Sequence, residues 1–292
     1  MTTELDQEWL SRHPLPDPNA ADDKNARGRV LIAGGSRTVP GGIVLTAEAA
    51  LRAGAGKVRL ATIGEAAVHI GVRIPEAAVI ALPQGEDGEI AIEGGLVIRD
   101  KACSCDALVL GPAMSESDDL PFLVEKVLGP ADGMPTTVLD AGALTAARDL
   151  APAIERHEGR VIMTPHPGEM ARLTGAAMDE VTANPVRFAT EAAALYGAVV
   201  LLKGKESHLA HPDGRLLHFR GGSVGLATAG SGDVLAGIIG GLAARGACPF
   251  EAAAWGCWLH AEAGRLLAER VGSIGFLARE LLPVIPEALE AA

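Results

Sequence analysis

Aromatic residues, cysteines and basic residues are all scarce in this 292-residue chain. Aromatic residues make up 3% of it, there are four cysteines, and 25 lysines and arginines stand against 37 aspartates and glutamates, for a net charge of −12. An acidic surface argues against nucleic-acid binding, which rests on basic surface, but it does not exclude a nucleotide held at a local anion site. The cysteines lack the paired spacing of a zinc site, so we expect free thiols in a reducing compartment.

Long hydrophobic runs are also missing. No apolar segment reaches the roughly 20 residues that cross a bilayer, and residues 1–23 lack the basic-then-apolar layout of a signal peptide. We therefore expect a cytoplasmic protein with no membrane partner. Hydrophobic residues still make up 48% of the chain, with no internal linker or repeat. The expected organisation is an extended N-terminal arm over residues 1–24 and one domain over residues 25–292.

Short apolar segments alternate with helical patterns along the chain. Most of them lead directly into a glycine or polar loop, which is typical of parallel strands joined by right-handed crossovers. The expected strands are residues 29–33, 57–62, 107–110, 137–139, 161–163 and 198–202. Residues 208–219 read as a hairpin turning at Asp213 and Gly214. Helices are expected over residues 43–53, 233–245, 251–270 and 275–289, the last one interrupted by Pro283 and Pro286.

The segment Ala-Gly-Ser-Gly-Asp at residues 229–233 is the most informative motif. Gly230 and Gly232 permit close backbone approach, and the following residues read as a helix start, so free N–H groups would surround an anion next to Ser231. A carboxylate beside a bound phosphate is electrostatically unfavourable, so we expect it to have a function there. Taking a proton from an attacking hydroxyl is one such function, and it indicates that Asp233 is a general base. The alternative is a simple glycine turn with an aspartate cap.

Three further loops follow expected strands. In Thr164-Pro165-His166-Pro167-Gly168-Glu169, Glu169 would reach Mg²⁺ through water and His166 would bind substrate, or Glu169 simply favours a helix start. Lys203 would meet a phosphate, or it belongs to a solvated turn. Asp140 is interpreted first as a helix cap, and otherwise as a group bonded to a metal's ligands. His260 and the other isolated histidines are interpreted as surface or packing residues.

Two common nucleotide motifs are absent. Gly34-Gly35-Ser36 lacks the G-x-G-x-x-G spacing of a Rossmann NAD site, and there is no Walker loop.

The motifs as a set resemble a known family. The Gly230–Asp233 loop resembles the anion hole and catalytic aspartate of the ribokinase-like superfamily, and residues 164–173 (Thr-Pro-His-Pro-Gly-Glu-Met-Ala-Arg-Leu) resemble its ADP-dependent NAD(P)H-hydrate dehydratases. The other matching segments are residues 28–36, 47–56, 110–112, 139–141, 202–204 and 227–241. The resemblance runs in order from about residue 24 to the end.

The resemblance implies a three-layer α/β/α sandwich around a mostly parallel sheet, with no lid, and a homotetramer. It implies that Ala47, Gly111, His166 and Asp233 face the hydrated cofactor. It also implies that the adenine nucleotide is bound by Lys203, Gly204, Lys205, Glu206 and Ser207 together with Gly230, Ser231 and Gly232.

The implied activity is dehydration of hydrated NADH or NADPH in its S form, with ADP or ATP as co-substrate and Mg²⁺ as cofactor. Asp233 would deprotonate the ring hydroxyl, which attacks the terminal phosphate, and the resulting ester then eliminates to restore NAD(P)H. An epimerase acting on the same hydrates would be a separate chain.

The chain departs from the family pattern at Ala113, Gly142, Ser223, Val224 and Ser231. These changes leave the base and the anion loop in place and affect the expected substrate contacts. Two other functions remain as alternatives. One is a kinase of the same superfamily for a sugar or a hydroxyalkyl heterocycle, and the other is a catalytically silent nucleotide-binding regulator.

Overall fold

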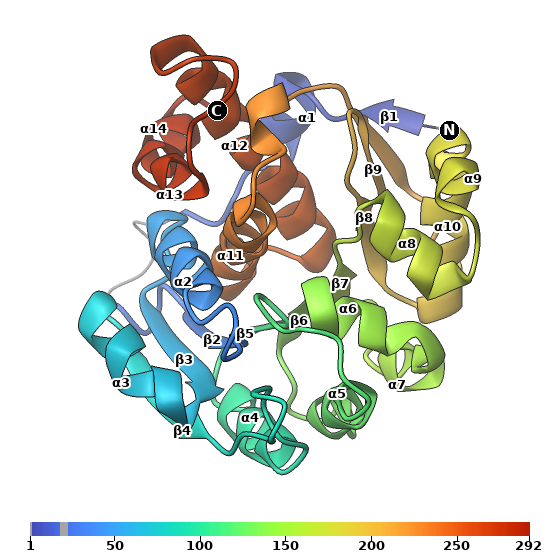
Figure 1. Ribbon diagram of the computed structural model, residues 1–292. Coiled ribbons are helices and arrows are strands. Elements are labelled where there is room, and N and C mark those ends of the chain that lie inside the picture. Colours follow the sequence, from blue (N-terminus) through green and yellow to red (C-terminus); the bar gives the residue numbers. More distant parts are fainter. Residues whose placement is uncertain (1, 18–22) are drawn as a thin grey trace.

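A ten-stranded sheet forms the centre of the computed structural model, which describes residues 2–17 and 23–292 (Figure 1). Its strand order is β1-β10-β9-β8-β7-β6-β5-β2-β3-β4. The pairs β10–β9 and β8–β9 are antiparallel, and the other seven neighbouring pairs are parallel. The strands are β1 (Thr2–Glu4), β2 (Arg29–Ala33), β3 (Lys57–Ile63), β4 (Ala78–Leu82), β5 (Ala107–Leu110), β6 (Thr136–Leu139), β7 (Val161–Met163), β8 (Val199–Leu202), β9 (Ser207–Ala210) and β10 (Leu216–Phe219). The parallel sheet and the β9–β10 hairpin expected from the sequence are confirmed.

Helices cover both faces of the sheet, which gives the three layers expected. Helices α2, α11 and α12 pack together on one face, and α4, α5, α6, α8 and α10 lie on the other (Figure 1). The helices are α1 (Gln7–Arg12), α2 (Gly42–Arg52), α3 (Gly64–Arg73), α4 (Gly94–Ala102), α5 (Leu120–Leu128), α6 (Ala141–Ala146), α7 (Ala151–Glu155), α8 (Pro167–Thr174), α9 (Met178–Ala183), α10 (Pro185–Tyr196), α11 (Ser231–Ala244), α12 (Pro249–Arg270), α13 (Ala278–Leu281) and α14 (Ile285–Glu290), with 3₁₀ turns at Ala147–Asp149, Val224–Leu226 and Leu282–Val284.

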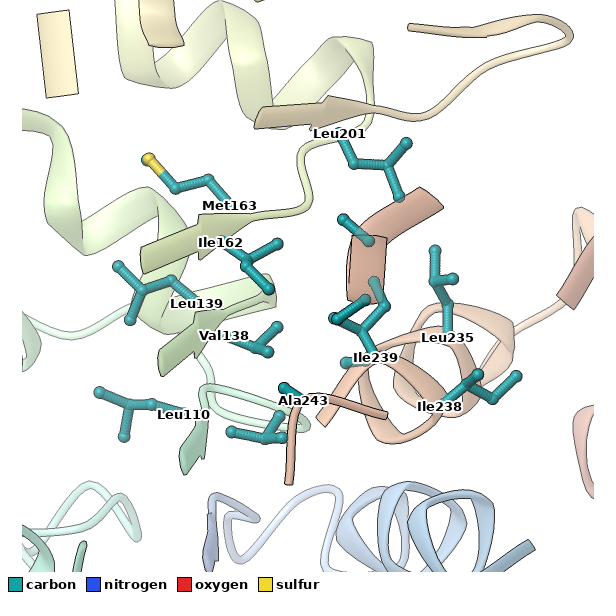
Figure 2. Close-up of a cluster of buried hydrophobic side chains, with 14 of the residues drawn as sticks. Leu110, Val138, Leu139, Ile162, Met163, Leu201, Leu235, Ile238, Ile239 and Ala243 are labelled. Atoms are coloured by element: carbon teal, nitrogen blue, oxygen red, sulfur yellow. The ribbon is translucent and has the colours of Figure 1, made fainter. Parts of the chain in front are cut away.

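The two-residue period of the strands explains how one sheet carries two helical layers. Figure 2 shows Val138 and Ile162 pointing toward Ile239 of α11, while Leu139 and Met163 point to the opposite face. All five side chains are fully buried. Because both faces are covered, the strands read as continuous apolar runs rather than as alternating ones.

Helix α11 lies unusually close to its neighbours, and its glycines are the reason. A Cβ at Gly237 would stand 2.3 Å from the carbonyl oxygen of Thr46, and one at Gly240 would stand 2.3 Å from Cγ2 of Val109. These glycines weaken the isolated helix, but they let α11 settle against α2 and β5. The close approach fixes the position of the first turn of α11.

The expectation of an extended N-terminal arm is wrong for the part of it that is described. Thr2–Glu4 pairs with β10 as an edge strand, and α1 buries Trp9 and Leu10 in the main core. Trp9 stacks on His13 and contacts the edge of Phe250, so aromatic packing stabilises the contact of this segment with α12. The remainder of the expected arm includes residues 18–22, which lie outside the described residues.

The C-terminal helical region is interrupted near its prolines, as expected from the sequence. The segment expected as one interrupted helix is divided into α13, a 3₁₀ turn at Leu282–Val284 and α14, with Pro283 and Pro286 at the breaks. Within residues 2–17 and 23–292, no helix has the length and hydropathy to cross a membrane.

We expect Gly237→Ala to destabilise the protein by roughly 1–3 kcal/mol, although alanine favours an isolated helix by about 1 kcal/mol, because the new methyl group collides with the Thr46 carbonyl. The matched control is Gly71→Ala in α3, where a Cβ meets only Cγ2 of Val79, at 3.5 Å. That variant should be neutral or slightly stabilised. Urea unfolding of both variants measures the difference, and equal effects would mean that helix propensity, not packing, decides at Gly237.

Candidate active site

The carboxyl ends of the parallel strands meet the first turn of α11. Asp140 follows β6, His166 follows β7 and Lys203 follows β8. A Cβ at Gly232 of α11 would lie 3.6 Å from Nζ of Lys203 and 4.0 Å from Oδ2 of Asp140. The structure thus brings together residues as far apart in the sequence as Asp140 and Gly232, as expected for ligand sites in open α/β sheets.

The glycine loop has the conformation that an anion site requires. Gly230 adopts a left-handed conformation, with φ of +88°, and α11 begins at Ser231. In the described part of the chain, no acceptor is assigned to the backbone N–H groups of Gly232 and Asp233, which stand in the first turn. Two free donors at the positive end of a 14-residue helix form a local anion site in an otherwise acidic protein.

Asp233 is the best candidate for a general base. Burial first, and the charge of Asp140 second, raise its pKa to about 7, against the opposing effects of Lys203 and a hydrogen bond from the backbone of Ala113. A carboxyl group that titrates near neutral pH can accept a proton from an alcohol and still be ionised in a useful fraction of molecules. Gly42 is buried beside this carboxylate: a Cβ there would stand 2.5 Å from Cβ of Ala113 and 3.1 Å from Oδ2 of Asp233.

Asp140 corrects the first interpretation from the sequence, because its side chain caps no helix. It is 2% exposed, accepts a hydrogen bond of 2.6 Å from Oγ1 of Thr164, and lies 3.3 Å from Nζ of Lys203. Lys203 is therefore not part of a solvated turn: its side chain is only 21% exposed. Burial lowers the pKa of Lys203, but Asp140 and Glu169 outweigh burial and hold it above its ordinary value.

His166 and Glu169 form a capping box at the start of α8. The His166 backbone N–H donates to Oε2 of Glu169 at 2.8 Å, and Nδ1 of His166 accepts from the N–H groups of Gly168 and Glu169. Glu169 therefore stabilises the helix start, as the second interpretation from the sequence expected. Because Nδ1 is an acceptor, the neutral ring carries its proton on Nε2. The side chain of His166 is 53% exposed, so this N–H is available to a ligand.

The other residues expected in the site fall into two groups. Ala47 and Gly111 are fully enclosed, and Gly111 has φ of +114° with its missing Cβ pointing at the carbonyl of Asp140. Their contact with a substrate stays a prediction. The segment from Lys203 to Ser207 connects β8 to β9, with Gly204, Lys205 and Glu206 exposed. Glu206 lies 2.6 Å from Nε2 of His218, a partner that the sequence did not indicate.

Sequence reasoning missed His260 as a neighbour of the anion loop. Its Nε2 lies 2.9 Å from Oγ of Ser231, across 29 residues. Burial, followed by the charge of Lys203, lowers the pKa of His260 to about 4, so the ring is neutral at pH 7. A single histidine on an apolar helix gives no signal of such a contact. Thr164 was likewise seen only as part of a loop, although its hydroxyl orients Asp140.

We expect the carboxyl group of Asp233 to titrate near pH 7 in the ligand-free protein, measured by carboxyl ¹³C NMR with Asp233→Asn for assignment. Asp140→Asn should lower this pKa, because it removes a neighbouring negative charge, and Lys203→Met should raise it, because it removes the positive one. The exposed Asp213 serves as an internal control that neither change should move. A midpoint near 4 for Asp233, unaffected by either variant, would contradict the assigned environment.

Comparison with known proteins identifies the family. A family model described as NAD(P)H-hydrate dehydratase matches residues 30–287. An ADP-dependent (S)-NAD(P)H-hydrate dehydratase of Xanthomonas campestris is 45% identical over 96% of this chain and 94% of its own length. A bifunctional NAD(P)H-hydrate repair enzyme of Moorella thermoacetica is 37% identical over 95% of this chain, and the chain spans about half of that protein, 52%.

A solved structure of the same family is also similar to this chain. The ADP/ATP-dependent NAD(P)H-hydrate dehydratase of Bacillus subtilis, co-crystallised with ATP and Mg²⁺, is 28% identical, with a TM-score of 0.82 over 99% of this chain and 98% of that one. The ribokinase-like fold expected from the sequence is thereby confirmed. Since the family model covers most of the chain and several relatives exceed 30% identity along nearly all of it, the chain belongs to the NAD(P)H-hydrate dehydratase family.

Proposed function

We propose that this enzyme removes water from the S form of hydrated NADH or NADPH at the expense of ADP, and so restores the reduced cofactor with release of AMP and phosphate. It is a hydro-lyase that acts in metabolite repair. The observation that carries the proposal is Asp233, a carboxyl group with a pKa of about 7 placed in the first turn of α11 beside free backbone N–H groups. The relatives named for this reaction support it.

The first step is phosphoryl transfer to the substrate. Asp233 takes the proton of the ring hydroxyl, whose oxygen attacks the terminal phosphorus of the nucleotide. The bond from that phosphorus to the bridging oxygen breaks, and AMP leaves. The N–H groups of Gly232 and Asp233 and the ammonium of Lys203 face the region where negative charge develops, and together they stabilise the transferred group.

The second step is elimination. Phosphate is a far better leaving group than hydroxide, so the lone pair of the ring nitrogen can expel it. The neighbouring ring carbon then gives up a proton, and the dihydropyridine is restored. The parts that make a kinase thus also make a dehydratase when the phosphorylated product is unstable.

A magnesium ion fits this site only with help from the nucleotide. In residues 2–17 and 23–292, no three acidic, histidine or cysteine side chains gather closely enough to hold a metal. Glu169 is already bonded to the His166 N–H and lies 3.8 Å from Lys203, so it would reach Mg²⁺ through water. Mg²⁺ bound mainly by phosphate oxygens and water is common, and it would neutralise charge on the transferred phosphate.

The proposed setting follows the same reasoning. We place the enzyme in the cytoplasm, as a homotetramer, with hydrated NADH or NADPH and an adenine nucleotide as its small-molecule ligands. An epimerase that interconverts the two forms of the hydrate is its proposed functional partner, in line with the bifunctional repair enzymes among its relatives.

The direct test mixes the protein with hydrated NADH, Mg²⁺ and either ADP or ATP, and follows the near-ultraviolet absorbance of reduced nicotinamide. We expect the absorbance to rise only when nucleotide is present. The nucleotide that gives the faster rise is the preferred phosphate donor. Asp233→Asn should reduce turnover by about 10²–10⁴-fold, the typical contribution of a general base. The variant should bind ADP as tightly as the wild type or more tightly, because a negative charge beside the phosphates is gone.

Two outcomes would count against the proposal. A stable phosphorylated product with no rise in absorbance would select the kinase alternative. Near-wild-type turnover in Asp233→Asn would remove Asp233 as the base.

His166 should act on the hydrated cofactor rather than on the nucleotide, because its side chain is exposed at the α8 start and no acceptor lies within hydrogen-bond distance of Nε2 in the described residues, Oε2 of Glu169 being 3.7 Å away. We expect His166→Ala to raise KM for hydrated NADPH about tenfold and to leave KM for ADP within about twofold. His166→Asn is the matched control, since asparagine keeps the helix cap and loses the ring N–H. It should show the same KM increase with less loss of stability. Equal losses for both substrates would contradict this contact.

A further inference from the structure

A hollow in the surface lies near the active site, and the proposed mechanism does not use it. It has a volume of about 390 Å³ and lies between helix α3 and the segment that leads into α2. Its apolar walls come from Pro40, Val44, Ile63, Ala66 and Ile70, and we call it the α3 slot. The volume falls within the roughly 300–1,000 Å³ that is usual for small-molecule sites.

The α3 slot begins one residue from a neighbour of the base. Gly41 lines the slot, and a Cβ at the next residue, Gly42, would stand 2.5 Å from Cβ of Ala113 and 3.1 Å from Oδ2 of Asp233. A ligand with its reacting hydroxyl at Asp233 would therefore pass Ala113 and Gly41 to reach the slot.

The slot lies on the side of Asp233 that faces away from Lys203. Lys203 follows β8, whereas Ile63 in the slot ends β3, and the sheet order between them is β8-β7-β6-β5-β2-β3. With strands about 4.8 Å apart, these two ends are about 24 Å apart. A donor nucleotide near Lys203 and a second long ligand can thus reach Asp233 from opposite sides.

The rim of the slot carries cationic groups. The guanidinium of Arg37 makes a two-pronged ion pair with Glu65, at 3.1 and 3.2 Å. His69 and Arg73, both exposed and four residues apart on α3, have no ion-pair or hydrogen-bond partner in the described ranges. Arg73 is therefore free to meet a phosphate, for which the guanidinium group is well shaped.

We propose that the α3 slot binds the adenosine half of the hydrated dinucleotide, with the adenine against Val44 and Ile70 and a phosphate at Arg73. This inference rests on the proposed function and names which part of the substrate the enzyme uses for affinity. An adenine ring is flat and largely apolar on its faces, which matches the walls. Its linked phosphates match the rim.

The other hollow near the active site fits this role less well. It is lined by Arg148 and Arg172, but Arg172 is already paired with Glu116 at 2.7 Å. Its apolar lining is limited to Leu120, Pro121 and Ala146, against five apolar side chains in the α3 slot.

The first test compares whole and truncated substrates on the wild-type enzyme. Hydrated reduced nicotinamide mononucleotide carries the reacting ring and lacks the adenosine half. We expect its kcat/KM to be at least tenfold below that of hydrated NADPH, chiefly through KM. Equal values would overturn the inference while leaving the proposed function intact. Failure on both substrates would instead refute the proposed function.

The second test uses variants of the slot. Arg73→Ala should raise KM for hydrated NADPH about tenfold and leave the truncated substrate unchanged. Ala66→Phe, which fills the slot, should act in the same direction, and the exposed Arg73 keeps the test decisive if that buried change impairs folding. Arg52→Ala, on the same layer but at the far end of α2, is the matched control and should change neither KM. Arg73→Ala also distinguishes the phosphates: a loss confined to hydrated NADPH indicates the 2′-phosphate, and a loss shared with hydrated NADH indicates the pyrophosphate.

A binding measurement gives a readout that does not depend on turnover. NADPH, the product, fluoresces, and its dissociation constant without added nucleotide should rise about tenfold in Arg73→Ala and not in Arg52→Ala. Light scattering on the same samples reports the oligomeric state. An altered oligomer with unchanged NADPH binding would assign this face to a second copy of the chain and overturn the inference.

Discussion

The ion pair between Asp140 and Lys203 is the interaction on which the active site depends. Three carboxylates, Asp140, Glu169 and Asp233, stand around one ammonium group, so the site has more negative than positive charge before any ligand arrives. Lys203 offsets part of this charge, and the Thr164 hydroxyl donates to Asp140 and holds it in place. Burial first, and then the charge of Asp140, raise the pKa of Asp233 to about 7, and Lys203 opposes them only in part. An aspartate with an ordinary pKa would be a weak base at neutral pH.

This electrostatic arrangement requires precise placement of α11, and small residues provide it. Gly237 and Gly240 let the helix approach α2 and β5 so closely that a methyl group at either position would collide with a neighbour. Gly232 leaves room for Lys203 and Asp140, and Gly42 leaves room for the carboxylate of Asp233. The abundance of glycine in the composition therefore has a structural meaning: glycines let α11 lie close to its neighbours.

Most of the parallel strands, and the place of Asp233 in the first turn of α11, were predictable from the sequence, because both depend on local signals. Apolar runs ending in glycine predict parallel strands, and a helix start after Gly232 predicts free N–H groups beside Asp233. Contacts between distant residues were not predictable in this way. Asp140 looked like a helix cap because capping is the usual role of an aspartate at that position, and only the fold brings Lys203 to it. His260 gave no local signal at all, and α1 looked like an arm because its core partners come from other segments.

The raised pKa of Asp233 also has a consequence for the protein as a whole. In the unfolded chain an aspartate titrates near its ordinary value of 3.8, whereas in the folded protein Asp233 titrates near 7. Between these two pH values the folded state holds a proton that the unfolded state has lost, so this group stabilises the fold less and less as the pH rises through that window. Ligand binding does not create the difficulty of ionising Asp233; folding has already imposed it. Ionisation of the proposed general base therefore opposes the stability of the fold.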